Sequence, residues 1–263
     1  MRWALRIVGF IVLFYLLPAG CMFAQHQVGD ANKSWWELRR DSSEQAPPAA
    51  DSSEAVIQVY AARAARWRGS FGVHTWVATK RRSENRYTRM EVIGYSVFWG
   101  HDAVRIRGGS PDSYWFGNRP YLLRDIRGGE NVDALIDRLH TAANRYPYNH
   151  TYKVWPGPNS NTFTAYLARA VPELRLELPS TAIGKDYVSW KQLVSRSPSG
   201  TGAQFSLKGY GGLLVGLEEG LEVNVLGLTA GVDLYPPAIK LPAVGRLGFS
   251  DYRRFNEADI APP

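Results

Sequence analysis

Residues 55–79, AVIQVYAARAARWRGSFGVHTWVAT, decide the fold expected from this sequence. They contain two β-branched and aromatic runs, 55–60 and 71–79, joined by a short arginine-rich connection. Such runs, bounded by glycine and polar residues, are typical of β-strands. Similar runs at 87–97 and 102–106 continue the pattern. The sequence therefore predicts a mostly antiparallel sheet in this part of the chain.

The spacing of apolar residues changes after residue 130. A helical repeat predicts an amphipathic helix over residues 130–145, carried by Val132, Leu135, Ile136 and Leu139. A second helix is predicted to begin near Pro158, and its apolar face includes Phe163, Tyr166, Leu167 and Ala170. Beyond Pro172, frequent glycines among short apolar pieces predict hairpins. The expected fold class is α+β: a mostly antiparallel sheet packed on two helices, followed by a Gly-rich β-hairpin C-terminal part.

The first 24 residues have the layout of a secretory signal. Arg2 and Arg6 precede an uncharged apolar run, which ends in Pro18-Ala19-Gly20-Cys21. Three interpretations stay open: a lipoprotein signal with lipidation of Cys21, a retained membrane anchor, and plain secretion with cleavage nearby. The Ala19-Gly20-Cys21 end resembles a bacterial lipobox, although Pro18 stands where that pattern has an aliphatic residue. All three interpretations place the rest of the chain outside the cytoplasm, in the bacterial cell envelope.

The composition after this segment divides the chain into three parts. Residues 25–53 are polar, contain a Pro-Pro pair and show little periodicity, which predicts a flexible tether. Apolar density is high over residues 54–250, so we expect a single globular domain there. Residues 251–263 are expected to form a C-terminal tail.

Charge and cysteine content exclude several classes of protein. The chain has 31 Lys and Arg against 24 Asp and Glu, a net charge of +7, and the basic residues are spread out. This distribution favours anionic surfaces and argues against a nucleic-acid partner. A single cysteine excludes an intramolecular disulfide, a Cys-rich zinc site and an iron–sulfur cluster. The histidines lack ligand spacing, so we expect no metal and no cofactor.

The start of the second predicted helix carries the first candidate for chemistry. Ser160 follows a Pro/Gly-rich turn, where free backbone N–H groups and the helix dipole stabilise negative charge. The alternative is that Asn159 or Ser160 simply caps the helix. His74 is the second candidate, because it lies in the middle of a predicted strand. Its alternative role is that of a packed core residue.

Six segments of the chain resemble a bacterial envelope family known only as domain of unknown function 3750. The resemblance covers essentially the whole predicted domain and implies no activity. It is carried by residues 57–69, 73–76, 154–163, 178–186, 199–202 and 240–246.

A more distant resemblance, to circularly permuted papain-like hydrolases and acyltransferases of the lecithin:retinol acyltransferase type, implies a permuted papain-like core and a catalytic site. It assigns His74 as the base and Ser160 as the nucleophile, with Asn159, Asn161 and Phe163 matching the surrounding pattern. Serine stands where that group has cysteine, so Ser160 would depend on His74 as a true general base. Glu91 is the candidate for orienting the imidazole, and an exposed strand glutamate is its alternative.

Two functions follow as expectations. The first is a Ser/His amide or ester hydrolase, or an acyltransferase, acting on a cell-wall peptide or lipid in the envelope. The second is a non-catalytic binding or structural protein with the same fold, using an aromatic groove. Residues expected in that groove are Trp76, Trp155 and Tyr148. Lys185 could also lie in the groove, and its alternative is a surface pair with Asp186. The expected partner is the membrane, reached through the N-terminal segment, and the oligomeric state stays open.

Overall fold

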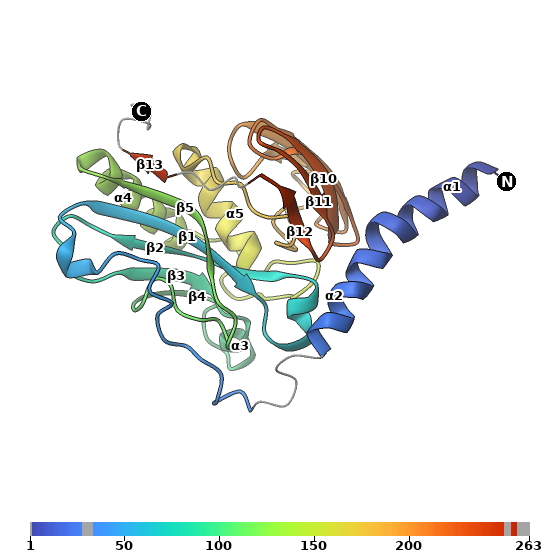
Figure 1. Ribbon diagram of the computed structural model, residues 1–263. Coiled ribbons are helices and arrows are strands. Elements are labelled where there is room, and N and C mark those ends of the chain that lie inside the picture. Colours follow the sequence, from blue (N-terminus) through green and yellow to red (C-terminus); the bar gives the residue numbers. More distant parts are fainter. Residues whose placement is uncertain (1, 28–33, 250–253, 257–263) are drawn as a thin grey trace.

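The computed structural model describes residues 2–27, 34–249 and 254–256, and they form two antiparallel sheets with two helices packed against the first (Figure 1). The first sheet has the strand order β13-β5-β1-β2-β3-β4, and only β13 pairs with its neighbour in parallel. Its strands are β1 (Ala55–Arg63), β2 (Val73–Lys80), β3 (Thr88–Val92), β4 (Val104–Gly108), β5 (Tyr121–Gly128) and β13 (Arg254–Asn256). The predicted α+β class is confirmed.

The central strands β1 and β2 are buried on both faces. Their register pairs Tyr60 with Trp76 and Ala62 with His74. Because side chains alternate along a strand, Val73, Thr75 and Val77 occupy one face, and His74 and Trp76 occupy the other. This alternation decides which of the candidate residues can meet.

Helices α4 (Glu130–Asn144) and α5 (Ser160–Ala170) cover one face of the first sheet. Both begin at the residues that the sequence predicted, and α4 buries all four residues of the predicted apolar repeat. The main core lies between these helices and the sheet, and includes Ile57, Val59, Val77, Leu139 and Phe163. A smaller cluster of Tyr60, Ala62, Trp76 and Ala78 occupies the opposite face.

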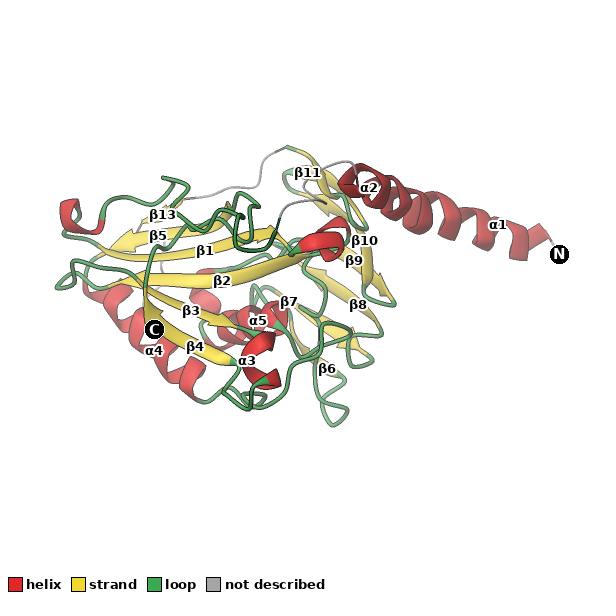
Figure 2. Cartoon of the chain, turned by 90° about the horizontal axis from the view of Figure 1, so that it is seen from below, coloured by secondary structure: helices red, strands yellow, loops and turns green. Residues whose placement is uncertain are grey.

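The second sheet is a meander of seven strands in sequence order. Its strands are β6 (Val194–Arg196), β7 (Gly202–Ser206), β8 (Gly211–Gly216), β9 (Gly220–Val225), β10 (Leu228–Leu234), β11 (Pro237–Leu241) and β12 (Gly245–Gly248). The predicted Gly-rich hairpins are confirmed. Figure 2 shows this sheet at one end of the first sheet, beyond α5.

The N-terminal residues form a helical segment consisting of α1 (Arg2–Ile11), the π-helical turn η1 (Val12–Leu16) and α2 (Leu17–Gln27). α2 lies against the domain near the second sheet, and α1 extends away from it (Figures 1 and 2). Within the described residues, none of the helices combines the length and the apolar character needed to span a bilayer. Three further short helices are the 3₁₀ turns η2 (Ala49–Asp51), η3 (Arg66–Ser70) and η4 (Pro172–Leu174).

Three local differences from the sequence prediction have physical causes. The predicted strand 87–97 stops at Val92 and continues as the helical turn α3 (Gly94–Phe98), where Gly94 lies so close to the Tyr152 ring that a Cβ would approach it to 2.4 Å. The sequence missed β5, because its charged residues interrupt the apolar pattern. Part of the predicted tether, residues 42–46, is held against the domain by hydrogen bonds to the carboxylate and the carbonyl of Asp112.

Candidate functional site

The N-terminus of α5 is closed by a capping box. The side chain of Asn159 accepts hydrogen bonds from the backbone N–H groups of Asn161 and Thr162, and Thr162 Oγ1 accepts one from the backbone of Asn159. Asn159 Nδ2 also donates to the carbonyls of Val154 and Ile183, at 3.0 and 2.9 Å. Asn159 is therefore the cap, and Ser160 is the first helical residue.

The residues beside Asn159 connect the helix to β2. Asn161 Nδ2 donates to the Val73 carbonyl at 3.0 Å, and its Oδ1 accepts from Thr75 Oγ1 at 3.0 Å. Thr75 Oγ1 also lies 2.9 Å from Thr164 Oγ1. Ser160 is only 3% exposed. Of the two amides that the papain-like resemblance placed around a nucleophile, Asn161 thus holds α5 against the sheet, and Asn159 caps the helix and ties it to two loops.

His74 lies on the other face of the sheet, away from α5. Its Nε2 is 3.2 Å from Glu91 Oε2, and its ring stacks on Trp115 with centroids 3.6 Å apart. Glu91 accepts a second hydrogen bond from Arg89, at 2.7 Å. All of these groups except Trp115 are at least nine-tenths buried. The contact between His74 and Glu91 that the sequence proposed is present, within an aromatic and ionic cluster.

The sheet therefore separates His74 from Ser160. Thr75, the neighbour of His74, faces the α5 N-terminus, so strand alternation directs the imidazole to the opposite side. A general base must lie within hydrogen-bond reach of the hydroxyl that it activates. The expected pairing of Ser160, His74 and Glu91 in one cleft is not what the structure presents, because Glu91 and His74 share one face and Ser160 belongs to the other.

The charges in the His74 cluster follow from burial and pairing. Burial lowers the pKa of His74, so the imidazole is neutral near pH 7 and donates to Glu91. Burial alone would raise the pKa of Glu91, but the hydrogen bonds from His74 and Arg89 and the charge of Arg89 outweigh it and hold the pKa at about 2. The Arg89 guanidinium also lies over the Trp76 ring, 4.1 Å from its centroid. This cluster is a closed polar core between β2, β3 and the loop that carries Trp115.

The residues expected to line an aromatic groove are dispersed. Trp76 is fully buried and donates to the Pro111 carbonyl at 2.6 Å. Trp155, in the loop before α5, is half-exposed and donates to the Leu226 carbonyl in the turn between β9 and β10, at 2.8 Å. Tyr148 packs beside the main core. Lys185 is buried, with Nζ 2.6 Å from Glu222 Oε2.

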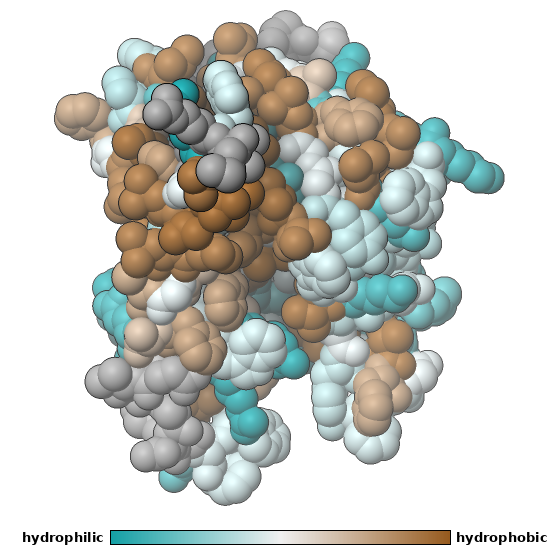
Figure 3. All heavy atoms as spheres, turned by 90° about the vertical axis from the view of Figure 1, so that its right-hand side faces the viewer, coloured by the Kyte–Doolittle hydropathy of each residue, from teal (hydrophilic) through white to brown (hydrophobic). Residues whose placement is uncertain are grey.

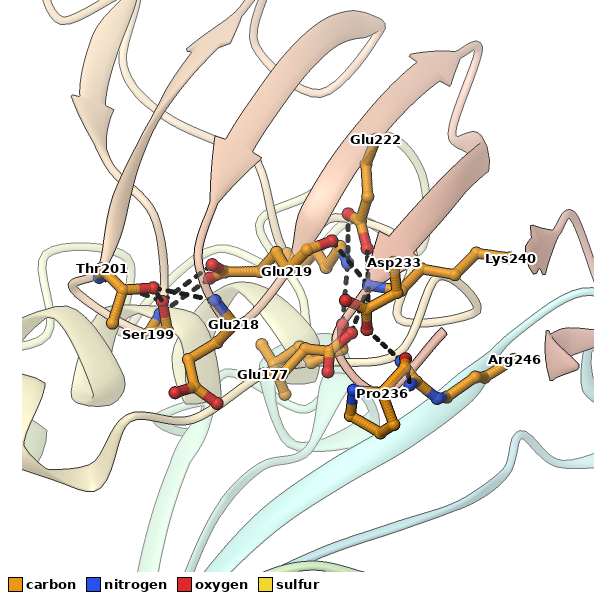
Figure 4. Close-up of polar contacts among 12 residues, drawn as sticks. Glu177, Ser199, Thr201, Glu218, Glu219, Glu222, Asp233, Pro236, Lys240 and Arg246 are labelled. Atoms are coloured by element: carbon orange, nitrogen blue, oxygen red, sulfur yellow. Dashed lines mark hydrogen bonds and ion pairs between the residues drawn. The ribbon is translucent and has the colours of Figure 1, made fainter. Parts of the chain in front are cut away.

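Through Glu222, Lys185 belongs to a buried ionic network on the inner face of the second sheet. Figure 4 shows the part of this network around Lys240. Lys240 Nζ lies at its centre and contacts the carboxylates of Glu177, Glu222 and Asp233. Asp233 pairs in addition with Arg246. Gly231 stands between Glu222 and Lys240 in the strand register, and a Cβ there would lie 3.0 Å from Glu222 Cγ, so the glycine leaves room for the pair. The surrounding carboxylates raise the pKa of Lys240, which holds its charge against burial.

The network explains an inversion of the usual sheet pattern. In β7 to β11 the buried positions carry mainly polar residues, among them Gln204, Ser206, Glu222, Asn224, Asp233 and Lys240. The outward positions carry apolar residues, which are Ala203, Phe205, Leu213, Val215, Leu221, Val223, Val225, Val232, Leu234, Ile239 and Leu247. We call the surface formed by these eleven residues the apolar face.

The register joins the apolar face into continuous rows. One row crosses six strands without interruption, through Ala203, Val215, Leu221, Val232, Ile239 and Leu247. Figure 3, which views the molecule from this side, shows hydrophobic side chains gathered over the upper half of the surface. A contiguous apolar patch of this kind marks a site of interaction with a protein or a membrane.

The N-terminal helical segment is in contact with the apolar face. Tyr15 in η1 is buried, and its hydroxyl donates to the Val223 carbonyl at 3.2 Å. Further along, Phe23 stacks on Phe71 with centroids 5.9 Å apart. Trp3, Leu5, Val8 and Leu13 on the same segment are exposed. The two apolar surfaces therefore adjoin one another.

One family model matches the part of the chain that contains most of the first sheet. The model described as "Protein of unknown function (DUF3750)" matches residues 54–187, about half of the chain. The chain belongs to this family. The match spans the first sheet from β1 to β5 together with α4 and α5, and it ends before the second sheet begins. No curated protein and no solved structure matches the chain, so the papain-like resemblance has no support from these comparisons.

Sequence reasoning missed the apolar face and the ionic network. The alternation in Leu-Glu-Val-Asn-Val (221–225) was available as a signal for a strand with one polar face. Alternation alone does not say which face is buried, and the general preference for apolar cores points to the wrong one.

Proposed function

We propose that this DUF3750 protein is a bacterial cell-envelope protein that binds a lipid bilayer through its apolar face. The observation that carries the proposal is the uninterrupted apolar row across six strands, whose side chains point outward while the charged residues of the same strands are buried. In water this arrangement exposes aliphatic surface without compensation. A bilayer would remove that surface from water.

Three further observations favour a bilayer over a second copy of the chain. The adjoining N-terminal segment exposes its own apolar side chains, and it resembles a signal or anchor. Aromatic residues with polar atoms, such as Trp155, Tyr210 and Tyr235, accompany the aliphatic face, as they do at membrane interfaces. The net charge of +7 favours anionic lipids and opposes self-association.

The proposal corresponds to the binding-protein alternative, not to the hydrolase. The separation of Ser160 from His74 by the sheet removes the geometry on which Ser/His chemistry depends. The expected envelope location and the membrane partner remain part of the proposal.

The test is sedimentation of the full-length chain with vesicles of phosphatidylglycerol and phosphatidylcholine. The double variant Val215→Glu/Ile239→Glu places two charges in the middle of the apolar row, at exposed positions that folding tolerates. We expect its vesicle affinity to fall at least tenfold, since each aliphatic side chain contributes roughly 1.5–3 kcal/mol on burial. The matched control is Phe98→Glu, because Phe98 is 80% exposed on α3, outside the apolar face.

Either of two outcomes would overturn the proposal. One is wild-type binding by the double variant. The other is a lipid-free dimer that Val215→Glu/Ile239→Glu dissociates, detected by analytical ultracentrifugation, which would identify the occupant as a second copy.

Cys21 gives a second route to the bilayer. Processing of a bacterial lipoprotein cleaves the chain before its cysteine, so a lipid on Cys21 would replace residues 1–20 as the anchor and leave the apolar face in place. Cys21 is exposed on α2 and close to the contact between Phe23 and Phe71, so a lipid attached to it would start beside the domain. We propose that Cys21 is lipidated in the cell. Labelling with a palmitate analogue should be lost in Cys21→Ala, and equal labelling of both chains would contradict lipidation at this residue.

A further inference from the structure

A cavity of about 390 Å³ lies between the two sheets, apart from the apolar face. The end of β1, the start of β5, the loop after η4 and the β11–β12 hairpin enclose it. Its volume is within the roughly 300–1,000 Å³ range of small-molecule sites, and a position between two structural units is common for such sites. Tyr121 lines it and is 41% exposed, so the cavity reaches the surface there.

Positive charge dominates the wall of the cavity. Its cationic residues are Arg63, Arg124, Lys240 and Arg246, and its only carboxylate is Glu177. Glu222 and Asp233, which balance Lys240 and Arg246, lie behind the wall and do not line the space. Arg124 likewise lies 3.9 Å from the Glu218 carboxylate, so Arg63 is the lining cation without a carboxylate partner among the described residues.

Arg63 is the cation whose charge is least compensated. Its Nη1 donates to the carbonyls of Ala243 and Gly69, at 2.6 and 3.3 Å, and its Nη2 donates to the Val244 carbonyl at 3.1 Å. In the part of the chain that the structure describes, it forms no ion pair with a carboxylate. It is half-buried, and burial lowers its pKa. Placing a guanidinium out of water without a counter-ion is unfavourable, and a bound anion would supply one.

Ser180 provides an independent observation in the same wall. It is 3% exposed, and its Oγ has no hydrogen-bond partner among the described residues. A buried hydroxyl without a hydrogen-bond partner destabilises the fold. An oxygen of a bound ligand beside Ser180 would accept a hydrogen bond from it. Arg63, which has no carboxylate partner among the described residues, and Ser180, whose buried hydroxyl has no hydrogen-bond partner among them, therefore line the same cavity.

We propose that this cavity binds a phosphate-bearing ligand. Guanidinium groups and a hydroxyl are the donors that proteins commonly use for phosphate oxygens, and arginine suits the geometry of that anion. Arg63 and Ser180 would bind the phosphate, and the cavity has room for the group attached to it. The site is separate from the apolar face, so it does not depend on the lipid-binding proposal.

The experiment measures binding of sn-glycerol 3-phosphate and of inorganic phosphate to the full-length chain, by calorimetry at constant ionic strength. Arg63→Gln should weaken binding at least tenfold. Arg68→Gln is the matched control, because Arg68 is an exposed arginine five residues away, and it should bind as the wild type does. Equal behaviour of the two variants would overturn the proposal. It would also be overturned by a wild-type chain that binds neither phosphate compound and whose binding to phosphatidylglycerol vesicles is unchanged in Arg63→Gln.

A second variant separates binding from folding. Ser180→Ala removes the unpaired hydroxyl, so its melting temperature should equal or exceed that of the wild type while its phosphate affinity falls severalfold. Unchanged affinity in Ser180→Ala would contradict the assignment of Ser180. The source of the phosphate follows from comparing sn-glycerol 3-phosphate with phosphatidylglycerol vesicles. Arg63-dependent binding of the former supports a free ligand, and Arg63-dependent binding of the vesicles alone supports a lipid headgroup.

Discussion

His74 links the stability of the fold to pH. Burial lowers its pKa below the ordinary 6.5, so the unfolded chain takes up a proton more readily than the folded chain. Stability is then present above about pH 6.5 and is lost as the pH falls below it. Glu91, with its pKa near 2, adds a loss only below about pH 4.5. We therefore expect the free energy of unfolding, measured with urea, to decrease between pH 7 and pH 5.

Substitution of His74 separates its contribution from those of other histidines. His74→Phe keeps a ring against Trp115 and leaves Glu91 paired with Arg89, and it should flatten the decrease between pH 7 and pH 5. Some slope will remain, because burial also lowers the pKa of His140. His101→Phe replaces an exposed histidine and should retain the wild-type slope. An unaltered slope in His74→Phe would show that this imidazole does not titrate on unfolding.

Within the second sheet, we expect substitution of Lys240 to lower the free energy of unfolding most. Lys240→Met leaves Glu177, Glu222 and Asp233 near one another in a buried space without their shared cation. Breaking a buried ion pair in this way costs about 3–5 kcal/mol of unfolding free energy. Lys153→Met changes an exposed lysine and should stay within about 0.5 kcal/mol of the wild type in the same urea titration. A loss below about 1 kcal/mol for Lys240→Met would mean that the network contributes little.

The stability of helix α5 depends on its N-cap residue, Asn159, and not on the hydroxyl of Ser160. Asn159→Ala removes the capping bonds and the donors to Val154 and Ile183, and it should cost about 2 kcal/mol. Ser160→Ala should cost less than about 1 kcal/mol, because the side chain of Ser160 does not cap the helix. Thermal unfolding of both variants measures the difference. Equal losses would contradict the assignment of the cap.

The same elements show what could be predicted from the sequence. The apolar repeat of α4, the start of α5 and the strand that carries His74 and Trp76 follow from local spacing, because each pattern is complete within one element. The face of β2 that α5 covers depends on how distant elements pack. Local spacing does not show which face this is, so the sequence paired Ser160 with His74 although they lie on opposite faces of the sheet. His74 and Glu91 are in contact as proposed, because β2 and β3 are adjacent strands.

In the whole molecule, the second sheet depends on the first for its stability in water. Its apolar face contributes nothing to folding while it is exposed, so its attachment rests on polar contacts across the buried face. These include Lys185 with Glu222, Lys240 with Glu177, and Arg169 with Gln204. Each pair joins the family-matched region to a strand beyond it. The two sheets should therefore unfold as one cooperative unit.

Hydrogen exchange measured by mass spectrometry tests this cooperativity in the lipid-free, full-length chain. In Lys240→Met, the slowest amides of β1 and β2 should lose protection by the same free energy as those of β9 to β11, although the substitution lies in β11. The reason is that opening the second sheet would leave Lys185, Arg169 and Glu177 buried without their partners, which destabilises the first sheet as well. Loss of protection confined to β9–β11 would instead show that the second sheet opens independently.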